Sequence, residues 1–145
     1  MPANRAEPGN VVTNAGRVFD PRALVVVGSG AAFGGILRFL IGAVVVARAG
    51  VSAAPYATLF INVSGSFLIG LALGTLQLRS DVSPLWRLFV ATGILGGYTT
   101  FSTFSIDALA LGSRGTLVVA GGYCIASVAL GIGAASAGLA LARLV

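Results

Sequence analysis

Apolar residues are gathered in four long runs that follow a short polar segment. The runs cover approximately residues 23–47, 55–78, 84–112 and 116–141. Each is longer than the roughly 20 residues that an α-helix needs to cross a hydrocarbon layer about 30 Å thick. The connections between them are too short to hold a further domain. The pattern therefore predicts an all-α membrane protein in which residues 21–145 form one domain of four transmembrane helices.

The segment before the first run differs from the rest of the chain. Residues 1–20 are polar and show no helical period, so we expect a flexible N-terminal arm. Asp20-Pro21 and Ser83-Pro84 each place a capping side chain before a proline, which favours a helix start at both points. The first run is longer than the core of a signal peptide, which has about 7–15 apolar residues, and we expect it to remain in the protein.

Composition narrows the possible chemistry. The chain is 57% hydrophobic and 9% charged, and its sequence contains neither histidine nor lysine. Without histidine there is no Ser-His-Asp or Cys-His nucleophile, and without lysine there is no P-loop or Schiff-base lysine. The lone cysteine, Cys124, has no partner for an intrachain disulfide. We therefore expect a membrane protein that is not an enzyme.

The positive charge comes from scattered arginines, which give a formal net charge of +5. They form no basic cluster of the kind that binds nucleic acid, so we expect no nucleic-acid partner. With four spans, the arm, the middle connection and the C-terminus lie on one side, with only Arg48 and Arg114 opposite. The arginines on that side are Arg5, Arg17, Arg22, Arg79, Arg87 and Arg143. This bias predicts that both termini are cytoplasmic.

The third run carries the strongest polar signal. Gly93, Gly96 and Gly97 are followed by five hydroxyl residues in residues 99–105. We expect them to break the third helix near residues 96–100, which would free carbonyls that suit a bare alkali cation. Phe101 and Phe104 then share one face. They are either core packing or rings whose positive edges can accompany a small anion.

Polar side chains also occur in the other runs. Arg38 lies about halfway along the first, as either a structural tether or an anion contact. In the second, Asn62 belongs to a stripe of polar or small residues spaced four apart, and we expect its amide to face a wet path. Asp107, in the third run, either pairs with an arginine or acts as a protonatable group. Tyr123 and Ser127 share one face of the fourth run. The stripe is Thr58, Asn62, Ser66, Gly70 and Gly74.

Small residues provide a second pattern. Gly30 and Gly34 are four residues apart in the first run, as are Gly70 and Gly74 in the second. This spacing is typical of helices that pack closely in membranes. We expect these glycines to lie at contacts between helices.

Three segments together resemble the Fluc, or CrcB, family of fluoride channels. They read GGILRF at residues 34–39, TLFINVSGSFLIG at residues 58–70 and GILGGYTTFSTFS at residues 93–105. They occur in the order that is typical of the family, and the resemblance covers about residues 23–143. Gly131 departs from the family pattern, in which a serine can continue a polar track.

The resemblance implies a passive fluoride channel in the bacterial inner membrane that exports fluoride from the cytoplasm and so reduces its toxicity. It implies an antiparallel, dual-topology dimer with two fluoride pathways at the interface. The carbonyls of Gly96 and Thr99 from both subunits would hold a structural sodium ion, and Arg38 would be structural near a vestibule. The pore residues would be Asn62, Phe101, Ser102, Thr103, Phe104, Tyr123 and Ser127.

Two alternatives stay open at this point. A small proton-coupled multidrug exporter has the same number of spans, but it needs a carboxylate in the first span and Asp107 would have to serve instead. A non-transporting membrane subunit would use its polar stripes only as contacts between helices. Within the channel hypothesis, the arginine bias allows either a homodimer or a pair with an oppositely oriented homologue.

Overall fold

The computed structural model describes residues 20–78, 82–113 and 117–144, and every regular element in them is helical. The long helices are α2 (Pro21–Ala49), α3 (Ala54–Leu78) and α7 (Leu117–Ala142). By length and composition, α2, α7 and the stretch Val51–Leu76 are each apolar enough to cross a membrane. The remaining elements are η1 (Val51–Ala53), α4 (Pro84–Arg87), η2 (Leu88–Leu95), α5 (Gly96–Tyr98) and α6 (Phe101–Ser113).

The third apolar run is the one that departs from a single helix. It is divided into α4, the π-helical η2, α5 and α6, and the backbone leaves the helical conformation at Thr99 and Thr100. Gly93 lies within η2, and Gly96 and Gly97 lie within α5. The interruption therefore lies within the predicted range of residues 96–100, but at its end, and the glycines that suggested it are themselves helical. Of the predicted arm, only Asp20 belongs to the described residues.

Local signals in the sequence set the helix ends. The Asp20 side chain accepts a hydrogen bond from the Arg22 N–H (2.9 Å), and the Ser83 hydroxyl accepts one from the Trp86 N–H (3.2 Å). Both caps precede a proline at the first helical position, as the sequence predicted. At its other end, α2 stops at Gly50, whose φ of 82° favours glycine over any residue with a Cβ.

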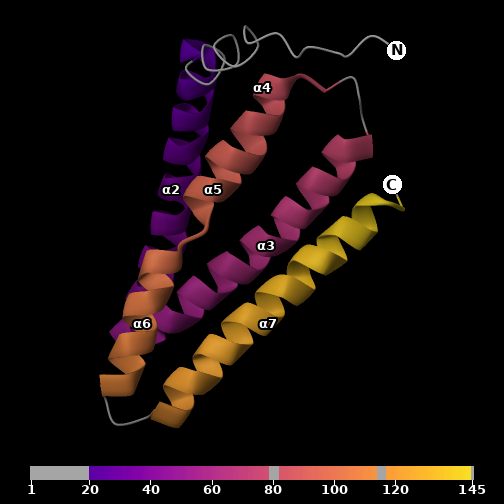
Figure 1. The fold of residues 1–145 in the computed structure, drawn as a ribbon. Coiled ribbons are helices and arrows are strands. Elements are labelled where there is room, and N and C mark those ends of the chain that lie inside the picture. The colour runs from indigo at the N-terminus through magenta and orange to yellow at the C-terminus, as the bar shows by residue number, and fades with distance from the viewer. Residues whose placement is uncertain (1–19, 79–81, 114–116, 145) are drawn as a thin grey trace, which may run out of the picture.

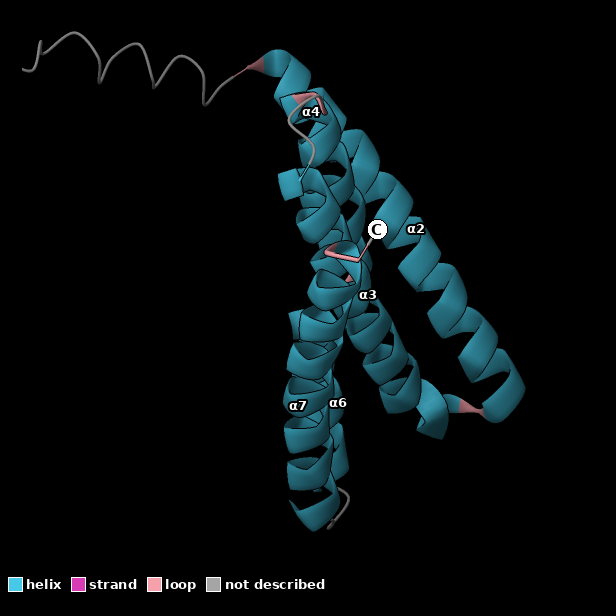
Figure 2. Cartoon of the chain, turned by 90° about the vertical axis from the view of Figure 1, so that its right-hand side faces the viewer, coloured by secondary structure: helices cyan, strands magenta, loops and turns pink. Residues whose placement is uncertain are grey.

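The helices are arranged as two crossing groups (Figures 1 and 2). In the first, α2 packs along η2 and α5. In the second, α3 and α7 lie side by side over most of their length, and this is the most extensive contact in the fold. Helix α6 leaves the first group after the interruption and packs against α7 and α3. The interruption at Thr99 and Thr100 therefore lies where the chain passes from one group to the other.

Glycines allow these helices to touch through their backbones. A Cβ at Gly34 would overlap the Ile94 carbonyl oxygen, and a Cβ at Gly97 would lie 2.5 Å from the Ala31 carbonyl oxygen. In the second group, Gly70 lies against Ala135 and Gly138 lies against Phe67 in the same way. The expected packing roles of Gly30, Gly34, Gly70 and Gly74 are confirmed, and Gly93 and Gly97 turn out to share that role.

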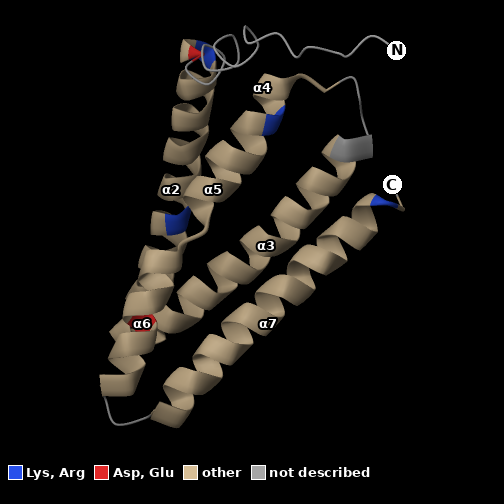
Figure 3. Cartoon of the chain, viewed as in Figure 1, with Lys and Arg blue, Asp and Glu red and all other residues tan. Residues whose placement is uncertain are grey.

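Most charged residues of the described chain lie near helix ends, whereas Arg38 and Asp107 lie within α2 and α6 (Figure 3). The start of α2, helix α4 and the end of α7 lie at one end of the molecule, and they carry Arg22, Arg87 and Arg143. Arg48 lies in the last turn of α2, at the opposite end. The other arginines counted for the orientation, Arg5, Arg17, Arg79 and Arg114, lie outside the described residues. The cytoplasmic location of the termini stays a prediction.

Neighbouring glycines on α2 provide a test of this packing. We expect Gly34→Val to lower the free energy of unfolding by about 1–3 kcal/mol or more, because its side chain would enter the backbone of η2 and α5. Gly35→Val is the matched control, since nothing lies within 4 Å of a Cβ there. Unfolding of the purified variants in detergent measures both changes. Equal losses for the two variants would contradict the close contact at Gly34.

Candidate functional site

The interruption in the third apolar run is the centre of the site. Thr99 ends the helical hydrogen bonding, because its N–H donates to the Leu95 carbonyl (3.1 Å) and its hydroxyl donates to the same oxygen (3.0 Å). Its backbone is extended, with ψ of 158°. The next helix begins at Phe101. Two consecutive residues therefore leave the helix in the middle of an otherwise helical segment.

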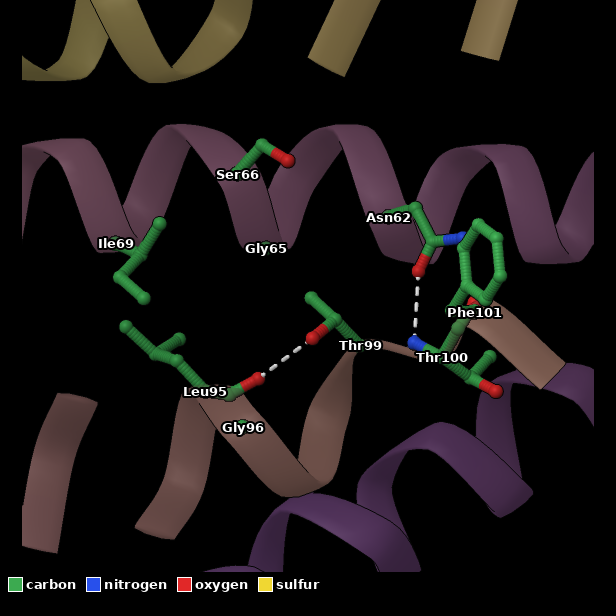
Figure 4. Close-up of a pocket in the computed structure, with 9 residues that line it drawn as sticks. All are labelled: Asn62, Gly65, Ser66, Ile69, Leu95, Gly96, Thr99, Thr100 and Phe101. Carbon is green, nitrogen blue, oxygen red and sulfur yellow. Dashed lines mark hydrogen bonds between the residues drawn. The ribbon is translucent and has the colours of Figure 1, made fainter. Parts of the chain in front are cut away.

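Asn62 of α3 supplies the hydrogen bonds that Thr100 loses (Figure 4). The Thr100 N–H donates to Asn62 Oδ1 (2.8 Å), and Asn62 Nδ2 donates to the Thr100 carbonyl (2.9 Å). One side-chain amide thus satisfies both backbone groups of one residue. Because Nδ2 carries two N–H groups, one donor remains outside this pair.

The two predicted cation ligands lie on either side of this contact. In a continuous helix the Gly96 carbonyl would accept from the Thr100 N–H, and the Thr99 carbonyl from the Thr103 N–H. Here Thr100 donates to Asn62, and the Thr103 N–H donates to the Thr100 hydroxyl (3.2 Å). Both carbonyls are therefore without their usual helical donors. Their role as sodium ligands stays a prediction.

An open pocket of about 280 Å³ lies beside the interruption (Figure 4). It is lined by four of the predicted site residues, which are Asn62, Gly96, Thr99 and Phe101. The other lining residues are Gly65, Ser66, Ile69, Leu95 and Thr100. The predicted amide donor and the predicted carbonyls therefore share one hollow, although they are far apart in the sequence.

Hydroxyl groups surround the start of α6. The Thr100 hydroxyl lies 3.3 Å from the Ser102 hydroxyl and 3.0 Å from the Thr103 hydroxyl, within hydrogen-bond distance of both. Ser102 and Thr103 are exposed, whereas Thr100 is buried. The sequence predicted Ser102 and Thr103 but missed Thr100, which organises the cluster. Its place at the end of the predicted break, directly before Phe101, was the available signal.

Aromatic rings continue from this cluster towards α7. The Phe101 and Phe104 rings are 5.6 Å apart at 41°, and the Phe104 and Tyr123 rings are 5.4 Å apart at 30°. Phe101 is 79% exposed, which is unusual for a core ring. The buried hydroxyls of Tyr123 and Ser127 have no hydrogen-bond partner among the described residues. Such groups are costly unless a ligand or water satisfies them.

Arg38 lines a second cavity, of about 460 Å³, on the other side of the interruption. Its polar lining includes Thr58, Thr100 and Thr103. The Arg38 Nε atom is buried and hydrogen-bonds no described residue, so the tether to loop carbonyls that the sequence suggested is not seen at that atom. Thr100 lines both cavities.

Asp107 is buried between helices and pairs with a threonine. The Thr58 hydroxyl donates to the Asp107 carboxylate (2.6 Å), and the two residues are 4% and 8% exposed. The predicted pairing of Asp107 with an arginine is not found among the described residues. Sequence reasoning also missed the contact between the Tyr98 and Ser64 hydroxyls (3.0 Å). Both pairs join residues of α3 to residues distant in sequence, which no local pattern reveals.

Comparison with known proteins identifies the family. Residues 25–139 match the family described as CrcB-like protein, Camphor Resistance (CrcB). The chain belongs to the CrcB family. The matched residues include the interruption and every CrcB site residue predicted above.

Curated CrcB relatives match over most of their length. A protein of Rhizobium meliloti (strain 1021) is 48% identical over 83% of this chain and 95% of its own. A protein of Granulibacter bethesdensis is 45% identical over 79% and 89% of the two chains, and one of Agrobacterium fabrum is 44% identical over 83% and 95%. Each of these relatives is named fluoride-specific ion channel FluC.

The Thr58–Asp107 pair leads to a stability prediction. We expect Thr58→Val to lower the free energy of unfolding by about 1.5–3 kcal/mol, because it leaves a buried carboxylate without its donor. In an Asp107→Asn background the same change should cost less. Thr75→Val is the control, since that hydroxyl bonds only carbonyls of its own helix. Unfolding in detergent measures all four variants, and an undiminished loss in the Asn background would argue against the pair.

Proposed function

We propose that this chain is a subunit of a passive fluoride channel that exports fluoride from the bacterial cytoplasm and so reduces its toxicity. The observation that carries the proposal is that the three relatives described above share the name fluoride-specific ion channel FluC. They match this chain over 89–95% of their length at 44–48% identity. The protein is then a transporter of the inner membrane rather than an enzyme. In the orientation that the arginine bias favours, its termini face the cytoplasm, and the antiparallel subunit has the opposite orientation.

The chemistry of the site supports this function. Fluoride is small and strongly hydrated, so a selective pore must replace its water with closely placed donors. The spare Asn62 N–H, the unpartnered hydroxyls of Tyr123 and Ser127, and the ring edges of Phe101 and Phe104 are donors of that kind. The hydroxyls of Ser102 and Thr103 extend the path along α6. No lysine is available to hold the anion too tightly.

In this proposal the segment from α4 to α6 is the third of four membrane spans and is interrupted at Thr99 and Thr100. A second subunit in antiparallel orientation covers the face that presents Phe101, whose ring is 79% exposed in the single chain. Two pathways then lie at the interface. The second subunit is another copy of this chain or a homologue that inserts in the opposite direction.

A sodium ion fits the carbonyls at the interruption. Neutral backbone oxygens suit an alkali cation at membrane depth, and those of Gly96 and Thr99 have lost their helical donors. We propose that both subunits contribute these carbonyls to one structural Na⁺ at the interface. The ion would supply positive charge that holds the two interruptions together.

The membrane potential is sufficient to drive export. A negative-inside potential is worth about 2.3 kcal/mol per charge for every 100 mV and pushes an anion outward without coupling to protons. The multidrug exporter is not favoured by the comparisons, because the relatives described above share the fluoride-channel name. In addition, the carboxylate that it would need, Asp107, is engaged by Thr58.

Fluoride efflux from vesicles tests the function. We expect proteoliposomes that contain only this chain to release fluoride but not chloride, as read by ion-selective electrodes. Phe101→Ile and Phe104→Ile should slow release at least tenfold, because aliphatic side chains have no positive ring edge. Phe33→Ile is the matched control, since that ring is 59% exposed on α2 and lines none of the cavities described here.

The same vesicles distinguish the two assemblies. Efflux from this chain alone requires self-pairing, whereas efflux that appears only after a homologue is added indicates a mixed pair. Normal efflux in both phenylalanine variants would overturn the pore assignment. Drug uptake powered by a pH gradient and abolished by Asp107→Asn would instead establish an exporter.

Removal of sodium tests the cation site. We expect the purified protein to unfold at a lower temperature when Na⁺ is replaced by N-methylglucamine, because an ion that binds only the folded dimer stabilises it. At 100 times its Kd, the ion would contribute about 2.7 kcal/mol. Potassium at the same concentration is the control for ionic strength. Identical unfolding temperatures in all three salts would argue against the site.

A further inference from the structure

The residues that form the interruption explain its position only in part. Thr99 and Thr100 are β-branched but do not stop a helix as proline does, and neither is followed by a proline. The adjacent glycines, Gly96 and Gly97, are themselves helical. The Thr100 hydroxyl caps the start of α6 by accepting a hydrogen bond from the Thr103 N–H (3.2 Å), but this cap leaves the Thr100 N–H without a helical acceptor. A group outside the segment must satisfy that N–H for the interruption to persist.

The bonds between Asn62 and Thr100 are of a kind that only an extended residue can make. In an α-helix, the N–H and C=O of one residue point in opposite directions along the axis, so a single side-chain amide cannot reach both. In an extended strand, the N–H and C=O of one residue point to the same side, as in an antiparallel pair. Asn62 bonds both groups of Thr100, at 2.8 and 2.9 Å. The amide therefore recognises the interrupted conformation itself.

A continuous helix is the competing state. If Asn62 made no bonds, the Thr100 N–H would be unsatisfied at membrane depth, where water does not replace the missing partner. The Gly96 carbonyl lies one turn earlier and would accept it in a continuous helix. The side chain of Asn62 stabilises the interrupted state instead, because it can bond the N–H and carbonyl of Thr100 only when the helix stops there.

Neighbouring contacts from α3 support the same conformation. The Tyr98 hydroxyl lies 3.0 Å from the Ser64 hydroxyl, and Tyr98 is 5% exposed. A Cβ at Gly65 would overlap the Thr99 side chain and lie 3.1 Å from the Tyr98 ring. Within one turn of α3, Ser64 contacts Tyr98, Gly65 contacts Thr99 and Asn62 contacts Thr100.

We propose that Asn62 is a positioning residue that selects the interrupted backbone at Thr100, separately from any bond that it makes to the ion. The pair also fixes the amide orientation, because Oδ1 must face the Thr100 N–H and Nδ2 must face its carbonyl. The second N–H of Asn62 Nδ2 then points in one fixed direction. This last consequence rests on the proposed fluoride pathway, whereas the selection of the backbone does not.

Solid-state NMR of the full chain in lipid bilayers tests the proposal. With labelled threonine, the Cα and Cβ shifts of Thr100 should fall in the extended range in the native protein. In Asn62→Leu they should move to the helical range. Ser66→Ala is the matched control, one turn further along α3 and lining the same pocket, and it should leave Thr100 extended. Extended Thr100 shifts in Asn62→Leu would overturn the proposal.

Two further variants make the result decisive. Asn62→Leu combined with Thr100→Pro should return Thr99 to the extended range, because proline cannot continue a helix and restricts the residue before it. A Thr99 that stays helical would count against the proposal. If Asn62→Leu does not fold, Asn62→Ser removes both bonds without adding bulk, and the same shifts decide.

Fluoride efflux from the same vesicles separates this inference from the proposed function. Loss of efflux in Asn62→Leu with unchanged Thr100 shifts would mean that Asn62 only binds the ion, which overturns the positioning role. A native chain that releases no fluoride, but whose Thr100 shifts change in Asn62→Leu, would overturn the channel and support the positioning role.

Discussion

Backbone amides at membrane depth must be satisfied by the protein, and in this chain that requirement converges on Thr100. A helix meets it automatically, residue by residue, so any departure needs another partner. The side chain of Asn62 is that partner. It takes the Thr100 N–H away from the Gly96 carbonyl, while the Thr100 hydroxyl takes the Thr103 N–H away from the Thr99 carbonyl. Asn62 and Thr100 both line the pocket beside the interruption, and the aromatic row begins at the next residue, Phe101.

The glycines build the frame that makes the contact possible. The helices within each group pack backbone to backbone, and between the groups Gly65 of α3 leaves room for the Thr99 side chain of the third run. Gly34 and Gly97 work in one group, and Gly70 and Gly138 in the other. Side chains at these positions would push apart the helices within each group, and a side chain at Gly65 would overlap Thr99 at the interruption.

The sequence predicts the helices and most residue types of the site, but not which residues meet. Apolar run length and the caps at Asp20 and Ser83 place the helices because both are local signals. The partner of Thr100 lies 38 residues away in sequence, and that of Asp107 lies 49 residues away. Gly93 and Gly97 were assigned to the break because glycine weakens helices in general, and only tertiary packing reveals their use as contact points.

The glycine contacts of α2 have a consequence for how sharply the site is defined. Gly30 and Gly34 meet the carbonyl oxygens of Phe89 and Ile94, and Gly97 meets that of Ala31. A shift of register by one residue would replace Gly30 and Gly34 at these oxygens either by Ser29 and Phe33 or by Ala31 and Gly35, and each shift would bring in at least one Cβ. Helix α2 and the segment formed by η2 and α5 therefore pack closely in only one register. An ion path that selects by size depends on such fixed packing, because helices that shift apart would widen the path and admit a larger ion.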